Sequence, residues 1–215
     1  MIRPFGINEF LTILYATQWT LLLSVIALIG GGIGGALIAM LRTGKYKIVR
    51  YAASAFVVVF QGTPLLMQLF LVFFGASIIG LNVNPWLAAA IGLTLHASAY
   101  LGDIWRGCIE SVPRGQWEAA KAVGLSYRTT MFDVVLPQAL SVALPPTVGF
   151  FVQLIKMTSV TAIIGFAELT RTGQIINNVT FEPFLVFSIV GVIYFCLCWP
   201  LSYLSTRLER RYATL

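Results

Sequence analysis

"SAYLGDIWRGCIESVPRGQWEAAKAVGLS", residues 98–126, leaves a long apolar segment and ends in a short polar one. Pro113 suits the start of a helix, and the alanines that follow are strong helix formers. Gly124 suits a helix end, so the polar part predicts a short helix within 113–126. A polar helix of this kind is unexpected in a chain whose other segments are so apolar.

The composition excludes an ordinary soluble domain. Hydrophobic residues make up 58% of the 215 residues, charged residues only 10%, and the mean hydropathy is +0.87. A soluble domain carries about 25% charged residues, so this chain is predicted to be an integral membrane protein. The net charge of +6 follows from basic loops and gives no indication of nucleic-acid binding.

Four runs of the sequence contain no Asp, Glu, Lys or Arg, and crossing a bilayer takes about 20 apolar residues. The second run holds two spans, because "LNVNPW" supplies a turn in its middle. We therefore expect an all-α protein with five transmembrane helices in one domain, residues 1–215, with a core of about 15–210. The charge-free runs are 10–41, 51–102, 134–155 and 183–206, and the expected spans are 11–41, 50–79, 87–105, 137–160 and 184–206. Between the spans we expect a cytoplasmic loop over 106–135 and an amphipathic outer segment or short helix over 165–183.

The basic residues indicate an orientation. They gather in 42–50, 106–128 and 207–211, and these segments alternate with segments that hold few basic residues. The positive-inside rule places such segments in the cytoplasm. We expect a multi-pass protein of a bacterial inner membrane, in contact with lipid, with the N-terminus outside and the C-terminus inside.

Residues that carry enzyme chemistry are scarce. His96 is the single histidine, and it is expected to form a hydrogen bond between helices. The spacing of Cys108, Cys196 and Cys198 predicts neither a disulfide framework nor a metal site, and no cofactor is expected in this chain. The glycines of "GGGIGG", residues 30–35, are expected to let a neighbouring helix approach closely.

Prolines lie inside two expected spans. Pro64 ends "QGTP" in the second span, and Pro145 and Pro146 lie well inside the fourth. A helix broken by proline frees backbone groups that lipid cannot satisfy, and transporters place substrate sites at such breaks. Both spans are therefore expected to be broken, either at a solute path or as kinks with a purely structural role.

The polar stretch also resembles a known motif. Glu118-Ala119-Ala120, with Gly124 four residues further on and Leu136-Pro137 after it, resembles the EAA loop of ABC importer permeases. The whole stretch 98–126 is similar to the histidine- and glutamine-permease type of that family. "QGTPLLMQ" and "KMTSVTAIIGFAELT" resemble the second- and fourth-span signatures of the same group. The resemblance covers residues of about 15–210 and implies the type I (MetI-like) permease fold and ATP-driven uptake of a polar amino acid.

The resemblance assigns roles to the loop. In the family this helix docks on a separate ATPase subunit and transmits the closure of that subunit to the spans. Glu118, Ala119 and Ala120 would contact the ATPase, and Gly124 would make the turn between two short helices. The sequence holds no Walker motif, so the partner would bind ATP and Mg²⁺. The other implied partners are a second permease, identical or similar, and an extracytoplasmic substrate-binding protein; the alternative for the loop is a solvated helix with no partner.

A zwitterionic amino acid at mid-membrane needs donors for its carboxylate and acceptors for its ammonium group. The small polar residues near the breaks and in the third span are candidates: Gly62, Thr63, Ser98, Asp103, Lys156, Thr158 and Ser159. Asp103 could instead pair with Arg106, and Lys156 could extend to the outer interface. Met157 stands where the family commonly has an acid, and Asp103 where it usually has glutamate. These departures leave open whether the partner permease holds the substrate site.

Three other functions remain open from the sequence. The first is a permease for another small solute, such as an opine or a sulfur amino acid derivative. The second is a membrane anchor subunit of an enzyme complex, which the single histidine and the lack of a carboxylate cluster disfavour. The third is a passive channel, which would have no use for an EAA helix.

Overall fold

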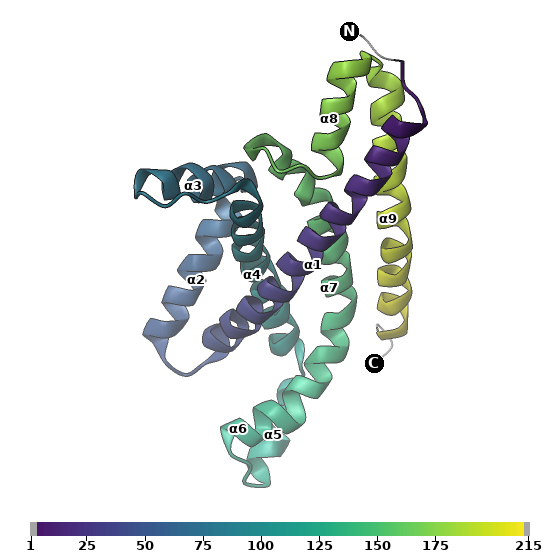
Figure 1. Ribbon diagram of the computed structural model, residues 1–215. Helices are drawn as coiled ribbons and strands as arrows, with labels where there is room; N and C mark the ends of the chain where they lie inside the picture. Colours follow the sequence, from purple (N-terminus) through teal and green to yellow (C-terminus); the bar gives the residue numbers. More distant parts are fainter. Residues whose placement is uncertain (1–3, 213–215) are drawn as a thin grey trace.

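The computed structural model describes residues 4–212, and every regular element among them is a helix (Figure 1). A single domain over 1–215 stays a prediction, and residues 1–3 and 213–215 lie outside the described part. In chain order the elements are α1 (Ile7–Thr43), α2 (Lys47–Gly62), α3 (Leu65–Ile78), α4 (Pro85–Ser111), α5 (Arg114–Ala122), α6 (Tyr127–Thr129), the π-helix η1 (Thr130–Val135), α7 (Leu136–Met157), the 3-10 helix η2 (Thr158–Ile164), α8 (Leu169–Thr180) and α9 (Pro183–Tyr212).

Four helical segments are long and apolar enough to cross a membrane: α1, α4, α9 and Tyr127–Ile164. The second expected span is a pair of helices, α2 and α3, which bend by 104° at their junction. With this pair counted as one broken span, the total is the five that the sequence predicts. The fourth span begins near Tyr127 and not near residue 137, because helical turns continue through the last part of the expected loop.

The glycine run lies in the contact between α1 and α4, the most extensive helix pair of the fold. A side chain added at Gly31 would collide with Ala97, and one at Gly35 would lie 2.8 Å from the Cβ atom of Leu101. Small residues allow helix backbones to approach closely in a membrane. The expectation that this run serves helix packing is confirmed.

The break between α2 and α3 follows from Pro64. The residue before a proline is pushed toward an extended backbone, and Thr63 has φ −117° and ψ 142°. The Gln68 side-chain amide donates to the carbonyl oxygens of Phe60 at 2.7 Å and Thr63 at 3.0 Å. Its amide oxygen lies 3.0 Å from Nδ1 of His96 on α4, which confirms the expected helix–helix hydrogen bond of His96. The expected break of the second span is thus confirmed. The break frees backbone carbonyl groups, and the buried side chain of Gln68 donates hydrogen bonds to them.

The expected break of the fourth span is wrong. α7 continues through Pro145 and Pro146 without interruption. Pro145 and Pro146 have no N–H to donate to the carbonyls of Ser141 and Val142. Prolines inside membrane helices are tolerated where neighbouring helices support the chain, and α7 packs against α4 and α9, where Ser205 Oγ donates to the carbonyl oxygen of Pro145 at 2.9 Å.

The helix geometry changes at the two ends of α7 instead. Pro137 has no N–H to donate to the carbonyl of Asp133, and the wider π-turn places the N–H of Leu136 on the carbonyl of Met131. At the other end, hydroxyl groups bond carbonyl oxygens three residues back, for example Thr161 Oγ1 to Thr158 at 2.6 Å.

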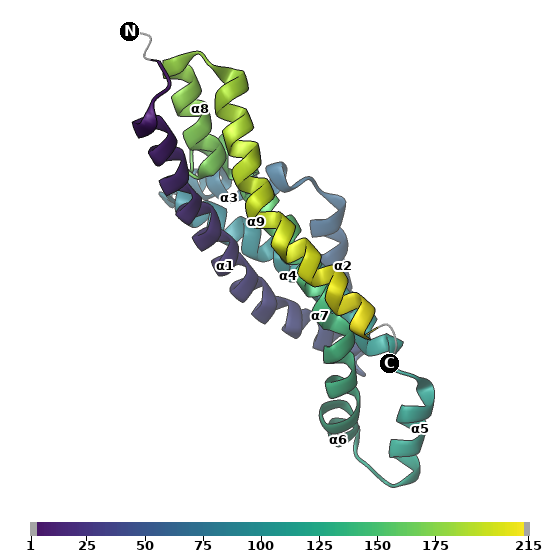
Figure 2. The same ribbon diagram turned by 90° about the vertical axis from the view of Figure 1, so that its right-hand side faces the viewer.

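The two ends of the molecule differ in content. α8 and the beginning of α1 lie at one end, and α5 and α6 lie at the other (Figure 1, Figure 2). The helix expected within 165–183 is present as α8, and an apolar cluster that includes Leu169, Ile176 and Val186 packs it against α1 and α9.

Candidate functional site

The polar loop helix is α5, and it is amphipathic. Ala120 is only 5% exposed and faces the bundle, where α5 contacts η1. Glu118 and Ala119, which point in other directions around the helix, are exposed. α5 therefore presents a small, polar surface away from the spans.

Gly124 ends this helix in the way that the sequence predicts. Its φ is +78°, in the left-handed region that favours glycine. The N–H of Leu125 donates to the carbonyl of Ala120, and the N–H of Gly124 to that of Lys121, each at 3.0 Å. This pair of bonds is the Schellman motif, which satisfies the last carbonyls of a helix and turns the chain sharply. Gly124 thus separates the two short helices α5 and α6, as expected.

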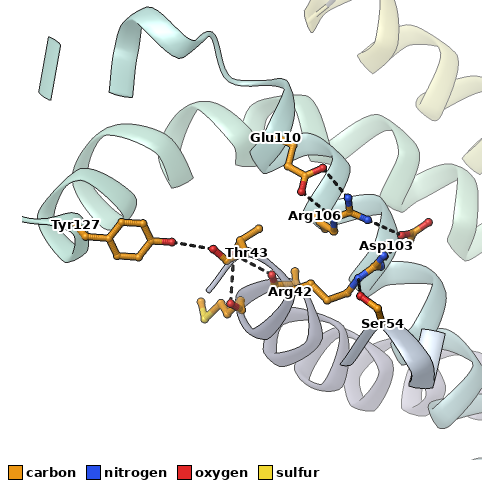
Figure 3. Close-up of polar contacts among 9 residues, drawn as sticks. Arg42, Thr43, Ser54, Asp103, Arg106, Glu110 and Tyr127 are labelled. Carbon is orange, nitrogen blue, oxygen red and sulfur yellow. Dashed lines mark hydrogen bonds and ion pairs between the residues drawn. The ribbon is translucent and has the colours of Figure 1, made fainter. Parts of the chain in front are cut away.

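Two aromatic residues join this loop to the spans. Trp117 of α5 stacks on Tyr127 of α6, with ring centroids 6.2 Å apart, and packs against an apolar cluster that includes Ala39 and Val135. The hydroxyl of Tyr127 donates to the carbonyl of Thr43 at the end of α1, at 3.1 Å (Figure 3). The sequence reasoning missed both residues, although aromatic side chains are frequent where a membrane meets water.

Next to this contact lies a network of charges that joins α1, α2 and α4 (Figure 3). Arg42 Nη1 lies 2.5 Å from Oδ1 of Asp103, and Arg42 Nε donates to the hydroxyl of Ser54 at 3.3 Å. Arg106 forms two hydrogen bonds with Glu110, at 2.8 and 3.0 Å, and lies 3.8 Å from Asp103. The expected Asp103–Arg106 pair is therefore present but long, and the closer partner of Asp103 is Arg42. Arg42 is only 9% exposed, so removal of Asp103 would leave a nearly buried cation unpaired.

The other α4 candidate for the solute path also faces α1. Ser98 is 5% exposed, donates to the carbonyl of Thr94 at 2.7 Å, and lies where a side chain at Gly34 would collide with it. In this conformation Ser98 is a packing residue of the α1–α4 contact.

The candidates at the first break are exposed. Gly62 and Thr63 lie at the surface where α2 meets α3. The Thr63 hydroxyl donates to the carbonyl of Val59 at 2.7 Å and accepts from the Gln68 amide at 3.0 Å. At the break, the hydroxyl of Thr63 is thus exposed next to the hydrogen-bonded side-chain amide of Gln68.

The candidates of the fourth span lie where α7 passes into η2. Thr158 is fully buried, Ser159 is half-buried, and Lys156 is exposed. Thr158 and Ser159 donate to the carbonyl oxygens of Ile155 and Lys156, each at 2.7 Å. The seven candidates therefore form separate groups: one at the α2–α3 break, one against α1, and one at the end of α7.

A buried carboxylate at the other end of the molecule was missed. Glu168 is fully buried and caps α8, accepting from the backbone N–H groups of Thr170 at 2.9 Å and Arg171 at 2.8 Å. It also accepts from the Tyr194 hydroxyl of α9 at 2.9 Å and from the Thr20 hydroxyl of α1 at 3.5 Å. Burial raises the pKa of the Glu168 carboxyl, while these hydrogen bonds oppose the rise. An acid directly before an amphipathic helix is a helix-start signal that could have indicated the cap.

Metal binding finds no support in the structure. Within residues 4–212, no three His, Cys, Asp or Glu side chains gather so that they could hold a metal ion. Three features remain: a loop helix on a sharp turn with aromatic links to the spans, an ionic network between α1 and α4, and the break between α2 and α3.

The family of the chain follows from three comparisons. The sequence model described as "binding-protein-dependent transport system inner membrane component" matches residues 31–214. A glutamine transport system permease protein of Escherichia coli (strain K12) is 37% identical over 196 residues, which are 90% of each chain. An L-cystine transport system permease protein of Bacillus subtilis (strain 168) is 37% identical over 194 residues, which are 90% of this chain and 83% of the relative.

A solved structure described as an amino acid ABC transporter with histidines is 34% identical and superposes with a TM-score of 0.88, covering 93% of this chain and 94% of the other. This match supports the all-α permease fold. A component of a transport system needs no catalytic residues of its own, in agreement with the lack of an enzyme-like cluster in the sequence. The chain therefore belongs to the family of inner membrane components of binding-protein-dependent transport systems, and it is a multi-pass transport subunit and not an enzyme.

Proposed function

We propose that this chain is the permease subunit of an ATP-driven importer of a polar amino acid. The observation that carries the proposal is the α5–Gly124–α6 loop, which presents an exposed small-residue helix at one end of the spans in a chain of this family. The descriptions of two relatives named above mention glutamine and cystine, which are both polar amino acids.

The proposed partners follow from the same loop. An ATPase subunit would receive α5 in a groove, with Glu118 and Ala119 at the contact, since small residues on a helix allow close approach. That subunit would bind ATP and Mg²⁺. A second permease, identical or similar, would complete the pathway, and a substrate-binding protein would deliver the solute from outside.

The contacts of the loop suggest how movement would reach the spans. Trp117 and Tyr127 connect α5 to the end of α1 through the carbonyl of Thr43. α5 also contacts η1, which leads directly into α7. A shift of α5 would therefore act on two spans, α1 and α7.

The orientation is part of the proposal. α1 begins at the α8 end of the molecule and α9 runs from that end toward α5 and α6 (Figure 2). The basic segments 42–50 and 106–128 lie at the α5 end of their helices. The positive-inside rule then favours a cytoplasmic α5, an outside N-terminus and an inside C-terminus.

For the solute path we propose Thr63 and Ser159 as the first contacts. Both offer a hydroxyl next to a departure from α-helix geometry, and hydroxyls can both donate and accept. Gly62, Lys156 and Thr158 would lie beside them. Ser98 would take part only if the α1–α4 contact opened during transport, and Asp103 only if its ion pair with Arg42 opened.

The proposal is tested with the complex that co-purifies with the full-length chain, reconstituted in vesicles. ATP-driven uptake of labelled glutamine, cystine and histidine is measured in competition with an opine and with a sulfur amino acid derivative. We expect one or more polar amino acids to be taken up and to be displaced by one another. Uptake of the opine alone would replace the proposed substrate class, and a complex without an ATPase would refute the importer function.

A further inference from the structure

Four arginines line a pocket of about 760 Å³ beside the α5–Gly124–α6 loop. They come from four different helices: Arg42 from α1, Arg50 from α2, Arg106 from α4 and Arg114 from α5. Glu110 is the one acid among the residues that line this pocket. We call it the arginine pocket.

The positive charge of the pocket is only partly balanced. Arg42 and Arg106 are held by the acids of the network in Figure 3. The side chains of Arg50 and Arg114 are both exposed, and neither makes an ion pair or hydrogen bond with any residue between 4 and 212. Two unpaired guanidinium groups that line one concave surface favour an anion between them, because each guanidinium can bind two oxygens of a phosphate or carboxylate.

The pocket lies at the boundary of the apolar segments. Arg42 directly follows the charge-free run 10–41, and Arg50 directly precedes the charge-free run 51–102. Tyr51 and two further aromatic side chains also line the pocket, and Tyr and Trp are enriched at the level of lipid headgroups. An anion at this level that remains attached to the apolar phase is a phospholipid headgroup.

We propose that the arginine pocket binds the phosphate of an anionic phospholipid, with Arg50 and Arg114 as its principal contacts. Basic pockets between transmembrane helices are sites of this kind. The bound phosphate would join α2 to α5 and so help to hold the α5–Gly124–α6 loop against the spans. Lipid binding at this pocket does not depend on the proposed substrate, and only its effect on coupling rests on the proposed function.

The test compares two pairs of substitutions in the full-length chain, purified with its partner subunits in nanodiscs of mixed phosphatidylcholine and phosphatidylglycerol. Arg50→Gln with Arg114→Gln removes the two unpaired charges of the pocket. Lys45→Gln with Lys47→Gln removes the same net charge from the same boundary but outside the pocket lining. The retained phosphatidylglycerol is measured by native mass spectrometry. We expect the arginine pair to lower it about tenfold and the lysine pair to change it far less, because the two lysines do not line the pocket.

Equal losses in the two pairs would overturn the proposal, because diffuse charge would then be responsible. Arg50→Lys with Arg114→Lys keeps the charge and should retain most of the lipid. A loss of lipid as large as that caused by Arg50→Gln with Arg114→Gln would also contradict the proposal. Release of the lipid by millimolar inorganic phosphate or glycerol phosphate would assign the site to a soluble anion. The ATPase retained by the complex is also measured in nanodiscs of phosphatidylcholine alone. If the variant with Arg50→Gln and Arg114→Gln retains less ATPase than the parent there, the two arginines contact that protein and not a lipid.

Discussion

The two ends of this molecule handle polar groups in opposite ways. At the α8 end, Glu168 is fully buried, and its oxygens accept hydrogen bonds from groups of α1, α8 and α9. At the α5 end, Glu118 and the unpaired arginines are exposed, and Trp117 and Tyr127 fix the loop to the spans. At the α8 end the polar groups bind one another, whereas at the α5 end they are available to a partner. The difference indicates that the α8 end maintains the fold, and it agrees with our proposal that the α5 end meets the ATPase.

The largest effect is expected from Glu168→Ala. The change removes the cap of α8 and leaves the buried hydroxyls of Thr20 and Tyr194 with fewer partners, so we expect a loss of about 3 kcal/mol in the free energy of unfolding. Thermal unfolding of the purified complex measures this loss. Glu118→Ala at the exposed end is the matched control, and it should leave the unfolding temperature unchanged. Equal stability of the two variants would remove the contrast between the ends.

The next effect is expected from Gly124→Ala. The residue has φ +78° with open space around it, so an added methyl group costs only backbone strain, about 1 to 2 kcal/mol. The strain opens the turn between α5 and α6, and we expect ATP-driven uptake to fall about tenfold while the spans stay folded. Gly115→Ala is the control, because Gly115 also has open space but lies inside α5 with an ordinary φ. Full uptake by the Gly124 variant would refute the need for a sharp turn.

A smaller effect is expected from pH at the α8 end. Burial raises the pKa of Glu168 above its value in the unfolded chain, so the folded state holds the proton more tightly. The free energy of unfolding should therefore be larger below the unfolded pKa and should decrease as the pH rises through the folded pKa. The side chain in Glu168→Gln does not titrate. The free energy of unfolding of this variant, measured between about pH 4 and about pH 7, should therefore decrease less with pH than that of the parent. A Glu168→Gln variant with the same pH dependence of stability as the parent would contradict a raised pKa for this carboxyl.

The smallest effect is expected from Tyr127→Phe. It removes one hydrogen bond, to the carbonyl of Thr43, and one such bond contributes about 1 kcal/mol. The ratio of solute taken up to ATP hydrolysed should fall, because α5 would move with less effect on α1. Tyr15→Phe is the control, since the Tyr15 hydroxyl is exposed and makes no hydrogen bond with residues 4–212. An unchanged ratio in the Tyr127 variant would exclude this contact from the coupling route.

Local patterns allowed much of the fold to be predicted from the sequence. The charge-free runs indicated the spans, Pro113 and Gly124 bounded α5 to within two residues, and the glycine run indicated a close helix contact. Each of these features depends on neighbouring residues in the chain, so the sequence displays it directly.

Features that depend on distant residues were missed or misjudged. The Arg42–Asp103 pair joins residues 61 positions apart, and the Tyr194–Glu168 bond joins α9 to the start of α8. The fourth span was expected to break at Pro145, but α7 continues there and packs against α9, whose Ser205, 60 positions away, donates to the carbonyl of Pro145. Proline propensity shows where a helix can break, whereas the contacts of the folded chain decide whether it does.

The exposed side of α5 is proposed as the surface that meets the ATPase, and one pair of cysteine variants tests this contact most directly. In a chain whose own three cysteines are replaced, Ala119→Cys places a thiol on the exposed side of α5, and Ala120→Cys places one on the side that is only 5% exposed. The measurement is cross-linking of each thiol to the ATPase in the assembled complex, with the rate of modification by a bulky thiol reagent. We predict that the thiol at 119 cross-links to the ATPase and is protected from the reagent by assembly, and that the thiol at 120 does neither. A thiol at 119 that stays fully reactive in the assembled complex and forms no cross-link would contradict the account.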